Sequence, residues 1–198
     1  MFAVGRNGRE RGGFWNVFIL KVANVFTMKK IIFFDGDGTL WYPQKTKYTK
    51  HPVWLYKDRR FKNHANHLIM TPSALSTIEK LKRMGVFTVV LSTHPHPPKE
   101  ADAILHHKIK HFELEELFDE VHATRVHHWS KGEFMLRILK RRKIPKSKAL
   151  MVGDSYTWDY KPAKERGIDA LLIKSKYEPM IPKVKRTIKK LSDIFRYL

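Results

Sequence analysis

The chain has 198 residues and carries 39 lysine and arginine residues against 19 aspartate and glutamate residues, a formal net charge of +20. With 42% hydrophobic residues it can build the core of one domain, which excludes disorder throughout. The absence of cysteine excludes disulfides, thiol nucleophiles and cysteine-ligated metal sites, and favours an intracellular, cytoplasmic protein. A run of about 18 apolar residues, which a transmembrane helix needs, does not occur.

The folded domain is expected to span residues 28–198, because a buried-strand pattern follows Met28 almost at once. Residues 1–27 are interpreted as an extension or a misassigned start. Ile31–Phe34 form a short apolar run that is typical of a strand buried on both faces of a parallel sheet. Residues 41–70 are polar, aromatic and basic without a sustained period, so we expect a long flap that could contain a hairpin.

Helices and strands alternate after the flap. Thr71 is predicted to cap a helix that has Pro72 in its first position and stops at Gly85. The further expected elements are a strand at Val86–Leu91, a helix from Pro97 to about His111, a weak strand at Glu120–Ala123, a helix from Ser130 through Arg142, a strand at Ala149–Val152, a short helix to Gly167, a strand at Ala170–Ile173 and a basic tail helix from about Lys183. This alternation predicts an α/β fold, a doubly wound parallel sheet with helices on both faces.

Polar side chains follow three of the predicted strands, at the sheet edge where open α/β sheets bind ligands. They are Asp35 and Asp37 after the first strand, Ser92 and Thr93 after the second, and Asp154 and Asp159 after a later one. Four crowded carboxylates would raise one another's pKa unless a cation lies among them. Hard oxygen donors without cysteine favour Mg²⁺ as that cation.

Four segments resemble, in order, the four motifs of the haloacid dehalogenase (HAD) superfamily of phosphotransferases. These segments are IIFFDGDGTL, VVLST, SKGEF and GDSYTWD, within a match that spans residues 31–173. The resemblance implies that Asp35 is the nucleophile that forms an aspartyl-phosphate. It implies that Asp37 is the acid and base that protonates the leaving alcohol and then deprotonates water. An aspartate at this second position fits phosphatases and mutases, whereas HAD ATPases carry threonine there.

The resemblance also implies a phosphate site and a metal site. Ser92 and the Thr93 backbone N–H would bind phosphate oxygens, and Lys131 would neutralise the nucleophile and the transferred oxygens. The metal set would be Asp35, Asp37 through its carbonyl, Asp154 directly, and Asp159, which would act through water or orient Lys131. Structural roles remain open for several of these residues: a turn at DGDG, helix caps at Ser92 and Asp159, and a solvated surface lysine at Lys131.

The spacing of the motifs bears on substrate access. Only 30 residues separate Leu40 from Thr71 and 38 separate Ser92 from Lys131, too few for a helical cap of the usual size. We therefore expect a capless member with a flap and no full cap domain. The segment TLWYP and the flap length resemble the magnesium-dependent phosphatases, but Ser92-Thr93-His94 stands where such relatives often have Ser-Arg-Thr. Basic and aromatic residues interleave in the flap, a composition that suits the binding of phosphorylated substrates that contain rings. The alternative is a basic, solvated loop whose aromatic residues pack on the domain.

These observations predict a Mg²⁺-dependent phosphomonoesterase that acts on a phosphorylated small molecule or macromolecule. The net charge of +20 leaves two alternatives open, a polynucleotide-end or nucleotide phosphatase and a non-catalytic nucleic-acid-binding protein on a HAD scaffold. Intact Asp35, Asp37, Lys131 and Asp154 argue against the non-catalytic alternative, since a binding module has no use for all four.

Overall fold

A parallel sheet forms the centre of the protein. The computed structural model describes residues 28–58, 60–124, 129–178, 184 and 186–198, so the expected extension at 1–27 lies outside the described residues. Six strands run in the order β5-β4-β1-β6-β7-β8. They are β1 Ile31–Phe34, β4 Phe87–Ser92, β5 Glu120–Ala123, β6 Ala149–Gly153, β7 Asp169–Ile173 and β8 Thr187–Ile188. Every pairing is parallel, which confirms the predicted α/β doubly wound fold.

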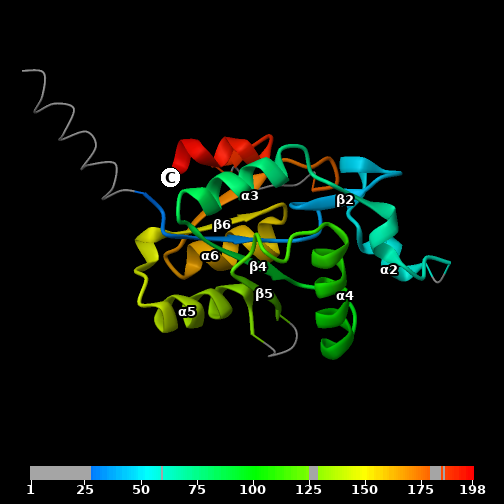
Figure 1. Ribbon diagram of the computed structural model, residues 1–198, viewed down its shortest axis with the longest axis horizontal. Coiled ribbons are helices and arrows are strands. Elements are labelled where there is room, and N and C mark those ends of the chain that lie inside the picture. The colour runs from blue at the N-terminus through cyan, green and yellow to red at the C-terminus, as the bar shows by residue number, and fades with distance from the viewer. Residues whose placement is uncertain (1–27, 59, 125–128, 179–183, 185) are drawn as a thin grey trace, which may run out of the picture.

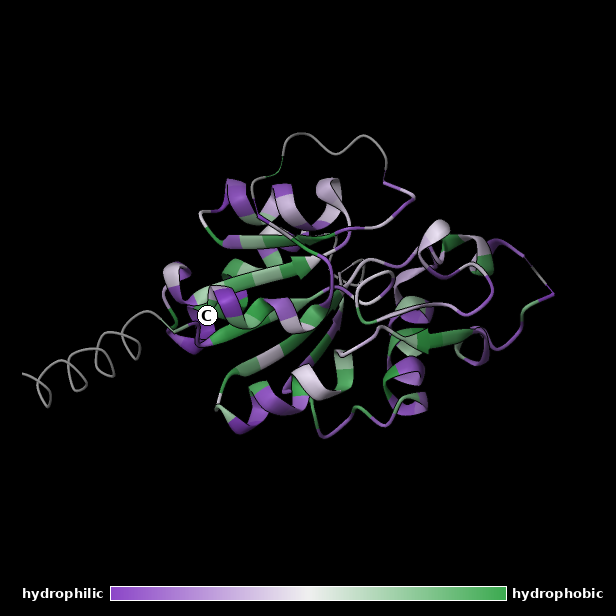
Figure 2. Cartoon of the chain, turned by 90° about the horizontal axis from the view of Figure 1, so that it is seen from above, coloured by the Kyte–Doolittle hydropathy of each residue, from purple (hydrophilic) through white to green (hydrophobic). Residues whose placement is uncertain are grey.

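Alternate residues of the strands pack into two hydrophobic clusters, one on each face of the sheet. Ile32 and Phe34 of β1 join the cluster that contains apolar residues of α3 (Ala74–Arg83) and α4 (Pro98–His111). Ile31 and Phe33 join the opposite cluster, with α5 (Lys131–Arg142) and α6 (Lys161–Glu165). Figure 1 shows the helices above and below the sheet, and Figure 2 shows the hydrophobic strands at the centre. Burial on both faces explains why the strands are continuous apolar runs.

Local signals place several helix ends correctly. Ser130 caps α5, because its side chain accepts from the Glu133 N–H while the Glu133 side chain accepts from the Ser130 N–H. Pro98 begins α4 at a position where a backbone N–H would have no partner within the helix, so proline loses no hydrogen bond there. Gly85 and Gly167 adopt left-handed conformations, with φ of +70° and +74°, after the helices that they end.

The prediction that Thr71 caps a helix is wrong. The helix α3 begins at Ala74 and follows Ser73, which has a φ of +64°. The Ser73 hydroxyl accepts from the Ser192 N–H at 3.2 Å and does not cap the helix. The Thr71 N–H donates to the Leu40 carbonyl at 2.9 Å, so the two residues that flank residues 41–70 are bonded to each other. The Ala74 N–H donates to the Thr71 carbonyl at 2.9 Å, so Thr71 closes a turn in which the positive φ of Ser73 delays the start of the helix.

The prediction of a tail helix from about Lys183 is wrong in the part of the tail that the structure describes. Lys183 lies outside the described residues. Thr187–Ile188 form β8, paired with Leu172 and Ile173 of β7. The helical part is a 3₁₀ helix, Leu191–Tyr197, and Leu191 and Ile194 are buried in the first cluster. β-branched residues beside an open strand edge therefore extend the sheet before the helical turn begins.

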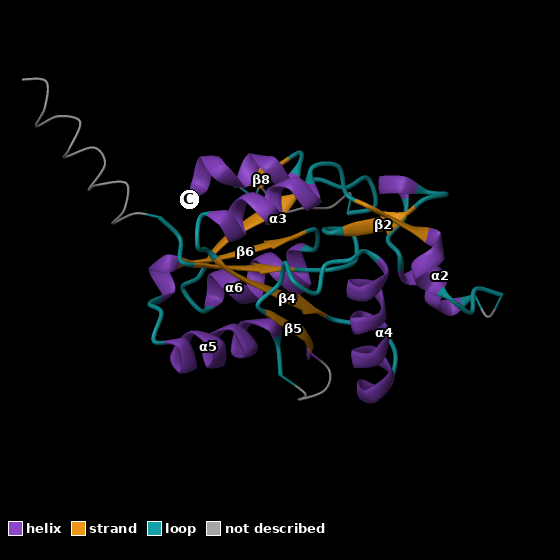
Figure 3. Ribbon diagram, viewed as in Figure 1, coloured by secondary structure: helices purple, strands orange, loops and turns teal. Residues whose placement is uncertain are grey.

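Residues 41–70 fold over the carboxyl end of the sheet. The antiparallel strands β2 (Trp41–Pro43) and β3 (Leu68–Met70) pair Trp41 with Met70. Between them lie the helix α2 (Val53–Lys57) and two 3₁₀ helices, Lys47–Thr49 and His64–His67. Figure 3 shows β2 and α2 at the same end of the molecule as α4. We call residues 41–70 the flap.

The sheet order creates a switch point beside β1. Strands β4 and β5 lie on one side of β1, and β6, β7 and β8 lie on the other. Ligands of such sheets bind where the chain changes direction, outside the carboxyl ends of the strands. Asp35 and Asp154 directly follow the two strands at this point, β1 and β6. Within the described part of the chain, no helix is both long enough and apolar enough to cross a membrane.

Candidate active site

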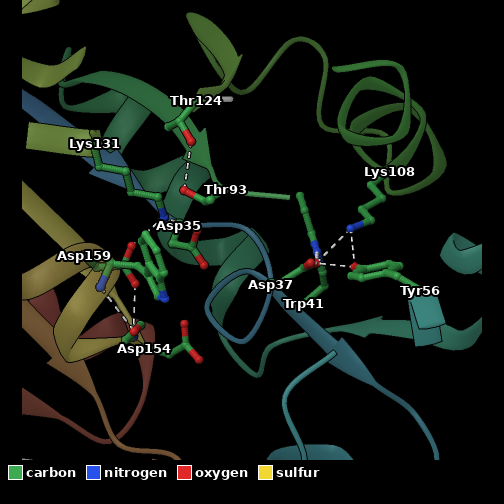
Figure 4. A network of polar contacts seen from close by, with 12 residues as sticks. Asp35, Asp37, Trp41, Tyr56, Thr93, Lys108, Thr124, Lys131, Asp154 and Asp159 are labelled. Carbon is green, nitrogen blue, oxygen red and sulfur yellow. Dashed lines mark hydrogen bonds and ion pairs between the residues drawn. The ribbon is translucent and has the colours of Figure 1, made fainter. Parts of the chain in front are cut away.

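Three carboxylates meet at the switch point. Asp35 follows β1, Asp154 follows β6 and Asp159 lies in η5 (Tyr156–Tyr160), a π-helical turn. All three residues are buried, and each offers an oxygen within 4.8 Å of the others. Figure 4 shows them converging from different parts of the chain. The meeting of Asp35 and Asp154 agrees with the prediction, since the carboxyl ends of neighbouring parallel strands lie side by side.

Asp159 reaches the cluster because Gly153 has no side chain. A Cβ atom on Gly153 would overlap the Asp159 carboxyl group. The Ser155 N–H donates to Asp159 Oδ2 at 3.0 Å, which fixes the carboxylate against the turn that follows β6. The GDS part of the fourth motif thus has three functions. Asp154 is itself a candidate ligand, Gly153 leaves space for Asp159, and the Ser155 N–H holds the Asp159 carboxylate in place.

Lys131 lies between two of the carboxylates. It is the first residue of α5, directly after the Ser130 cap, and only 4% of its surface is exposed. Its Nζ donates to Asp35 Oδ1 and, at 2.5 Å, to Asp159 Oδ1. Burial lowers the pKa of Lys131, but Asp159 and Asp35 together raise that pKa above its ordinary value. Lys131 is therefore a buried ammonium and not a solvated surface lysine.

The charges of this cluster do not balance. Three carboxylates and one ammonium leave two negative charges on these four side chains. Burial, with a further contribution from Asp159, raises the pKa of Asp35 to about 7 despite the opposing charge of Lys131. Burial and the charges of Asp35 and Asp159 raise the pKa of Asp154 well above its ordinary value. A divalent cation with a preference for oxygen ligands fits this donor set and would neutralise it.

Tyr177 adds a donor to the same cluster. Its hydroxyl donates to Asp154 Oδ2, and burial together with Asp154 raises the pKa of Tyr177 far above its ordinary value. A Cβ atom on Gly38, whose φ is +84°, would overlap both Tyr177 and Asp154. The second glycine of DGDG is thus required both by its backbone conformation and by the close approach of Asp154.

The Asp37 carboxylate lies outside the carboxylate cluster, in a network of its own (Figure 4). Asp37 Oδ1 accepts from Trp41 Nε1 at 2.5 Å and from Lys108 Nζ at 2.9 Å, and Oδ2 accepts from the Tyr56 hydroxyl at 2.6 Å. Burial would raise the pKa of Asp37, but the charges of Lys108 and His94 and the hydrogen bonds from Tyr56 and Lys108 hold this pKa well below its ordinary value. The side chain is therefore separate from the candidate metal ligands, and metal binding through its carbonyl stays a prediction.

The two hydroxyl residues after β4 lie in different surroundings. Ser92 is the last residue of β4 and is 3% exposed. A Cβ atom on Gly36 would lie 3.1 Å from Ser92 Oγ, so this hydroxyl borders the DGDG loop. Thr93 lines the cavity, and its hydroxyl pairs with that of Thr124 at 2.8 Å. Phosphate binding by Ser92 and by the Thr93 backbone stays a prediction.

A cavity of about 1090 Å³ surrounds the carboxylates. The predicted site residues that line it are Asp35, Asp37, Thr93, Lys131, Asp154 and Asp159. The flap contributes His51, Val53 and Tyr56 to the same wall. Trp158 of η5 also lines the cavity and is 62% exposed, so it presents an aromatic surface at the opening.

The sequence matches the profile of the haloacid dehalogenase-like hydrolase family over residues 28–173. The chain is a member of this family. The match covers most of the chain and contains every predicted site residue. A search of curated proteins found no match.

Solved HAD structures share the fold of this family member. A HAD phosphatase from Thermococcus onnurineus is 17% identical, with a TM-score of 0.63, over 85% of this chain and 97% of that one. A HAD-superfamily hydrolase of subfamily IA from Geobacter sulfurreducens is 16% identical, with a TM-score of 0.64, over 86% of this chain and 100% of that one. A predicted phosphoglycolate phosphatase from Haemophilus somnus is 17% identical, with a TM-score of 0.64, over 85% of this chain and 97% of that one. At these identities the likeness establishes the fold alone.

Four residues of this HAD site were not predicted from the sequence as functional candidates. Trp41, Tyr56 and Lys108 hold Asp37, and Tyr177 contacts Asp154. The sequence marks Trp41 only as part of TLWYP and Tyr56 only as one aromatic residue of the flap. Lys108 has a detectable signal, because it occupies a buried position on the apolar face of α4. Tyr177 comes from a loop after β7 without any pattern that points to the site.

Proposed function

We propose that this HAD-family protein is a Mg²⁺-dependent phosphomonoesterase that acts through an aspartyl-phosphate on Asp35. One observation carries the proposal. Asp35 lies in the wall of the cavity with Lys131 bonded to its Oδ1 and with Asp154 and Asp159 within 4.8 Å. These contacts support the proposal because they bring a buried carboxylate, an ammonium and two further carboxylates together, and phosphoryl transfer uses such groups as nucleophile, charge-neutralising cation and metal ligands.

The reaction would proceed in two displacements. In the first, Asp35 Oδ2 forms a bond to phosphorus, because Lys131 holds Oδ1, and the ester P–O bond breaks. The protonated form of Asp37 would give its proton to the departing alkoxide, and the water of the second displacement would restore that proton. In the second, a water molecule forms a bond to phosphorus, the bond to Asp35 breaks, and Asp37 would take the proton of the water. The ion pair with Lys108 favours the carboxylate form of Asp37, which the second displacement uses, and opposes the protonated form, which the first displacement uses.

The carboxylates of Asp35, Asp154 and Asp159 would hold the metal, with the Asp37 carbonyl as a further ligand. When bound, Mg²⁺ would neutralise charge on the carboxylates and on the phosphate oxygens. Ser92, the Thr93 N–H and Lys131 would bind the remaining phosphate oxygens. These assignments agree with the charge of the cluster, in which three carboxylates exceed one ammonium by two negative charges.

We further infer that the flap serves in place of a cap domain, as in capless HAD phosphatases of the magnesium-dependent group. His51, Val53 and Tyr56, all from the flap, line the cavity, so the flap touches any ligand that fills it. We also propose that the chain consists of an extension at residues 1–27 and a hydrolase domain at residues 28–198. Phosphorylated small molecules or exposed phosphate groups on macromolecules would reach such a site.

Hydrolysis of p-nitrophenyl phosphate with Mg²⁺ and with EDTA tests this proposal. We expect Mg²⁺-dependent turnover by the wild-type protein. In Asp35→Asn we expect kcat to fall by at least about 1,000-fold, because removal of a catalytic nucleophile lowers kcat by this much or more. Asp102→Asn is the matched control, because Asp102 is a half-exposed aspartate on α4. Equal activity in Asp35→Asn and wild type would exclude the mechanism. A panel of sugar phosphates, nucleotides, phosphotyrosine and a 3′-phosphorylated oligonucleotide would then identify the substrate class.

A further inference from the structure

Lys108 occupies a position in α4 where the helical pattern calls for an apolar side chain. The buried residues of α4 are Ala101, Leu105, Lys108 and Ile109, the spacing of one helix face turned toward a core. Only 1% of Lys108 is exposed, so even its ammonium group lies inside the protein. Burial of an unpaired ammonium is strongly unfavourable, and lysine is rarely found in such places without a partner.

The partner of Lys108 is the carboxylate of Asp37. Lys108 Nζ donates to Asp37 Oδ1 at 2.9 Å and also to the hydroxyl of Tyr56. The same ammonium lies 4.5 Å from the ring centre of Tyr56 and 5.7 Å from that of Trp41. One carboxylate and two aromatic rings therefore lie close to the charge, and Figure 4 shows Lys108 and Tyr56 together on one side of Asp37.

Donors from three separate elements hold the Asp37 carboxylate. Trp41 of β2 and Lys108 of α4 bind Oδ1, while Tyr56 of α2 binds Oδ2. Because both oxygens are engaged, the carboxyl group cannot rotate without breaking at least one of these bonds. Asp37 and Tyr56 line the cavity, whereas Lys108 reaches them from the buried face of its helix.

Stability alone does not account for this lysine. Replacing a buried ion pair by well-packed apolar residues is often neutral or stabilising, and the neighbours of Lys108 on the helix face are already apolar. We propose that Lys108, together with Tyr56, is a positioning residue that holds the Asp37 carboxylate toward the leaving-group oxygen. This inference rests on the proposed function, in which Asp37 transfers the proton.

The role predicts a particular kinetic pattern. Lys108 acts through Asp37, so its loss should lower kcat more than it changes KM. A misplacement of about 1 Å costs a catalytic group about 100-fold in rate. The loss should be larger for alkyl phosphates than for p-nitrophenyl phosphate, because an alkoxide needs a proton to depart and p-nitrophenolate hardly does. A purely structural lysine would instead lower the rate with both substrates equally.

Lys108→Met tests the proposal, with Lys110→Met as the matched control from the exposed face of the same helix. We expect kcat to fall about 100-fold with an alkyl phosphate and markedly less with p-nitrophenyl phosphate, while Lys110→Met matches wild type. In an Asp37→Asn background, Lys108→Met should cause little further loss, since the two residues act as one unit. Tyr56→Phe, which introduces no charge change, should repeat the dependence on the leaving group if Lys108→Met fails to fold.

Equal losses with both substrates, or a full further loss in the Asp37→Asn background, would overturn the proposal. Crystal structures of wild type and Lys108→Met provide a readout that does not need activity. We expect the Asp37 carboxylate to leave Trp41 or Tyr56 in the variant, and an unmoved carboxylate would overturn the positioning role. If wild type hydrolyses no phosphate ester, the proposed function fails, but the two structures still decide whether Lys108 holds Asp37.

Discussion

Asp154→Asn should remove the stabilisation that Mg²⁺ gives to the folded protein. Asp154 is 1% exposed, and its carboxylate lies within 4.8 Å of oxygens of Asp35 and Asp159. The substitution preserves the shape of the side chain but removes one of the three carboxylates. When every carboxylate is ionised, as it is with a metal ion bound, the cluster including Lys131 then carries one negative charge instead of two. A divalent cation should therefore bind wild type and not the variant.

The expected magnitude follows from binding linkage. At a Mg²⁺ concentration one hundred times its Kd, binding to the folded state alone stabilises the protein by about 2.7 kcal/mol. In a domain of this size each kcal/mol raises Tm by about 2 to 4 °C, so we expect a rise of about 5 to 11 °C. Without metal, Asp154→Asn should be more stable than wild type at neutral pH, because burial and like charges raise the pKa of Asp154 in the folded state and so disfavour the carboxylate.

Thermal unfolding measured by calorimetry over a Mg²⁺ series, with EDTA as the metal-free reference, checks both effects. Asp102→Asn controls for the loss of a carboxylate elsewhere and should respond to Mg²⁺ as wild type does. The reasoning is refuted if Asp154→Asn keeps the wild-type rise in Tm, or if Mg²⁺ leaves the wild-type Tm unchanged.

Three further predictions concern other parts of the fold. Asp169→Asn should lower the free energy of unfolding at pH 7 by about 1 to 3 kcal/mol, measured by urea unfolding, because the substitution breaks the 2.6 Å ion pair with Lys29. Burial would raise the pKa of Asp169, but Lys29, with Arg186 and Lys164, holds it below its ordinary value in the folded protein. The deficit should therefore persist down to the ordinary pKa of an aspartate and disappear as the pH falls through the lowered pKa of the folded state. Gly153→Ala should displace Asp159 and abolish the rise in Tm with Mg²⁺ while circular dichroism stays native. Ser130→Ala should cost about 1 kcal/mol in the same unfolding assay, through loss of the cap of α5.

The sheet and its acidic edge can be predicted from the sequence because their signals are local. Each central strand is buried on both faces, so the sequence shows it as a short apolar run that ends in polar residues. Parallel strands place their carboxyl ends at one edge, so the strand pattern alone predicts that Asp35 and Asp154 meet. The capping pattern at Ser130 in the same way places Lys131 at the start of a helix.

Long-range contacts explain where prediction from the sequence is wrong. Thr71 is a residue type that often caps helices, but Ser73, which precedes the helix, has a positive φ and its hydroxyl accepts from the distant Ser192 N–H. Thr187–Ile188 lie in a basic tail whose composition favours a helix, yet they pair with the edge of β7 as a strand. In both places a partner distant in the chain outweighs a weak local preference.

The surroundings of Asp37 are hard to predict for the same reason. Lys108 is 71 residues away from Asp37 in the chain, and Tyr56 is 19 residues away within a segment that lacks a regular period. Neither belongs to one of the four motifs. A charged residue on an otherwise apolar helix face is the one signal in the sequence that marks Lys108.

Trapping the covalent intermediate tests the central claim most directly. Wild-type protein quenched in acid during turnover of p-nitrophenyl phosphate with Mg²⁺ should carry one phosphoryl group, which mass spectrometry should locate on Asp35. The Asp35→Asn protein should carry none and should not turn over. A phosphoryl group on another residue, or undiminished turnover by Asp35→Asn, would contradict the account.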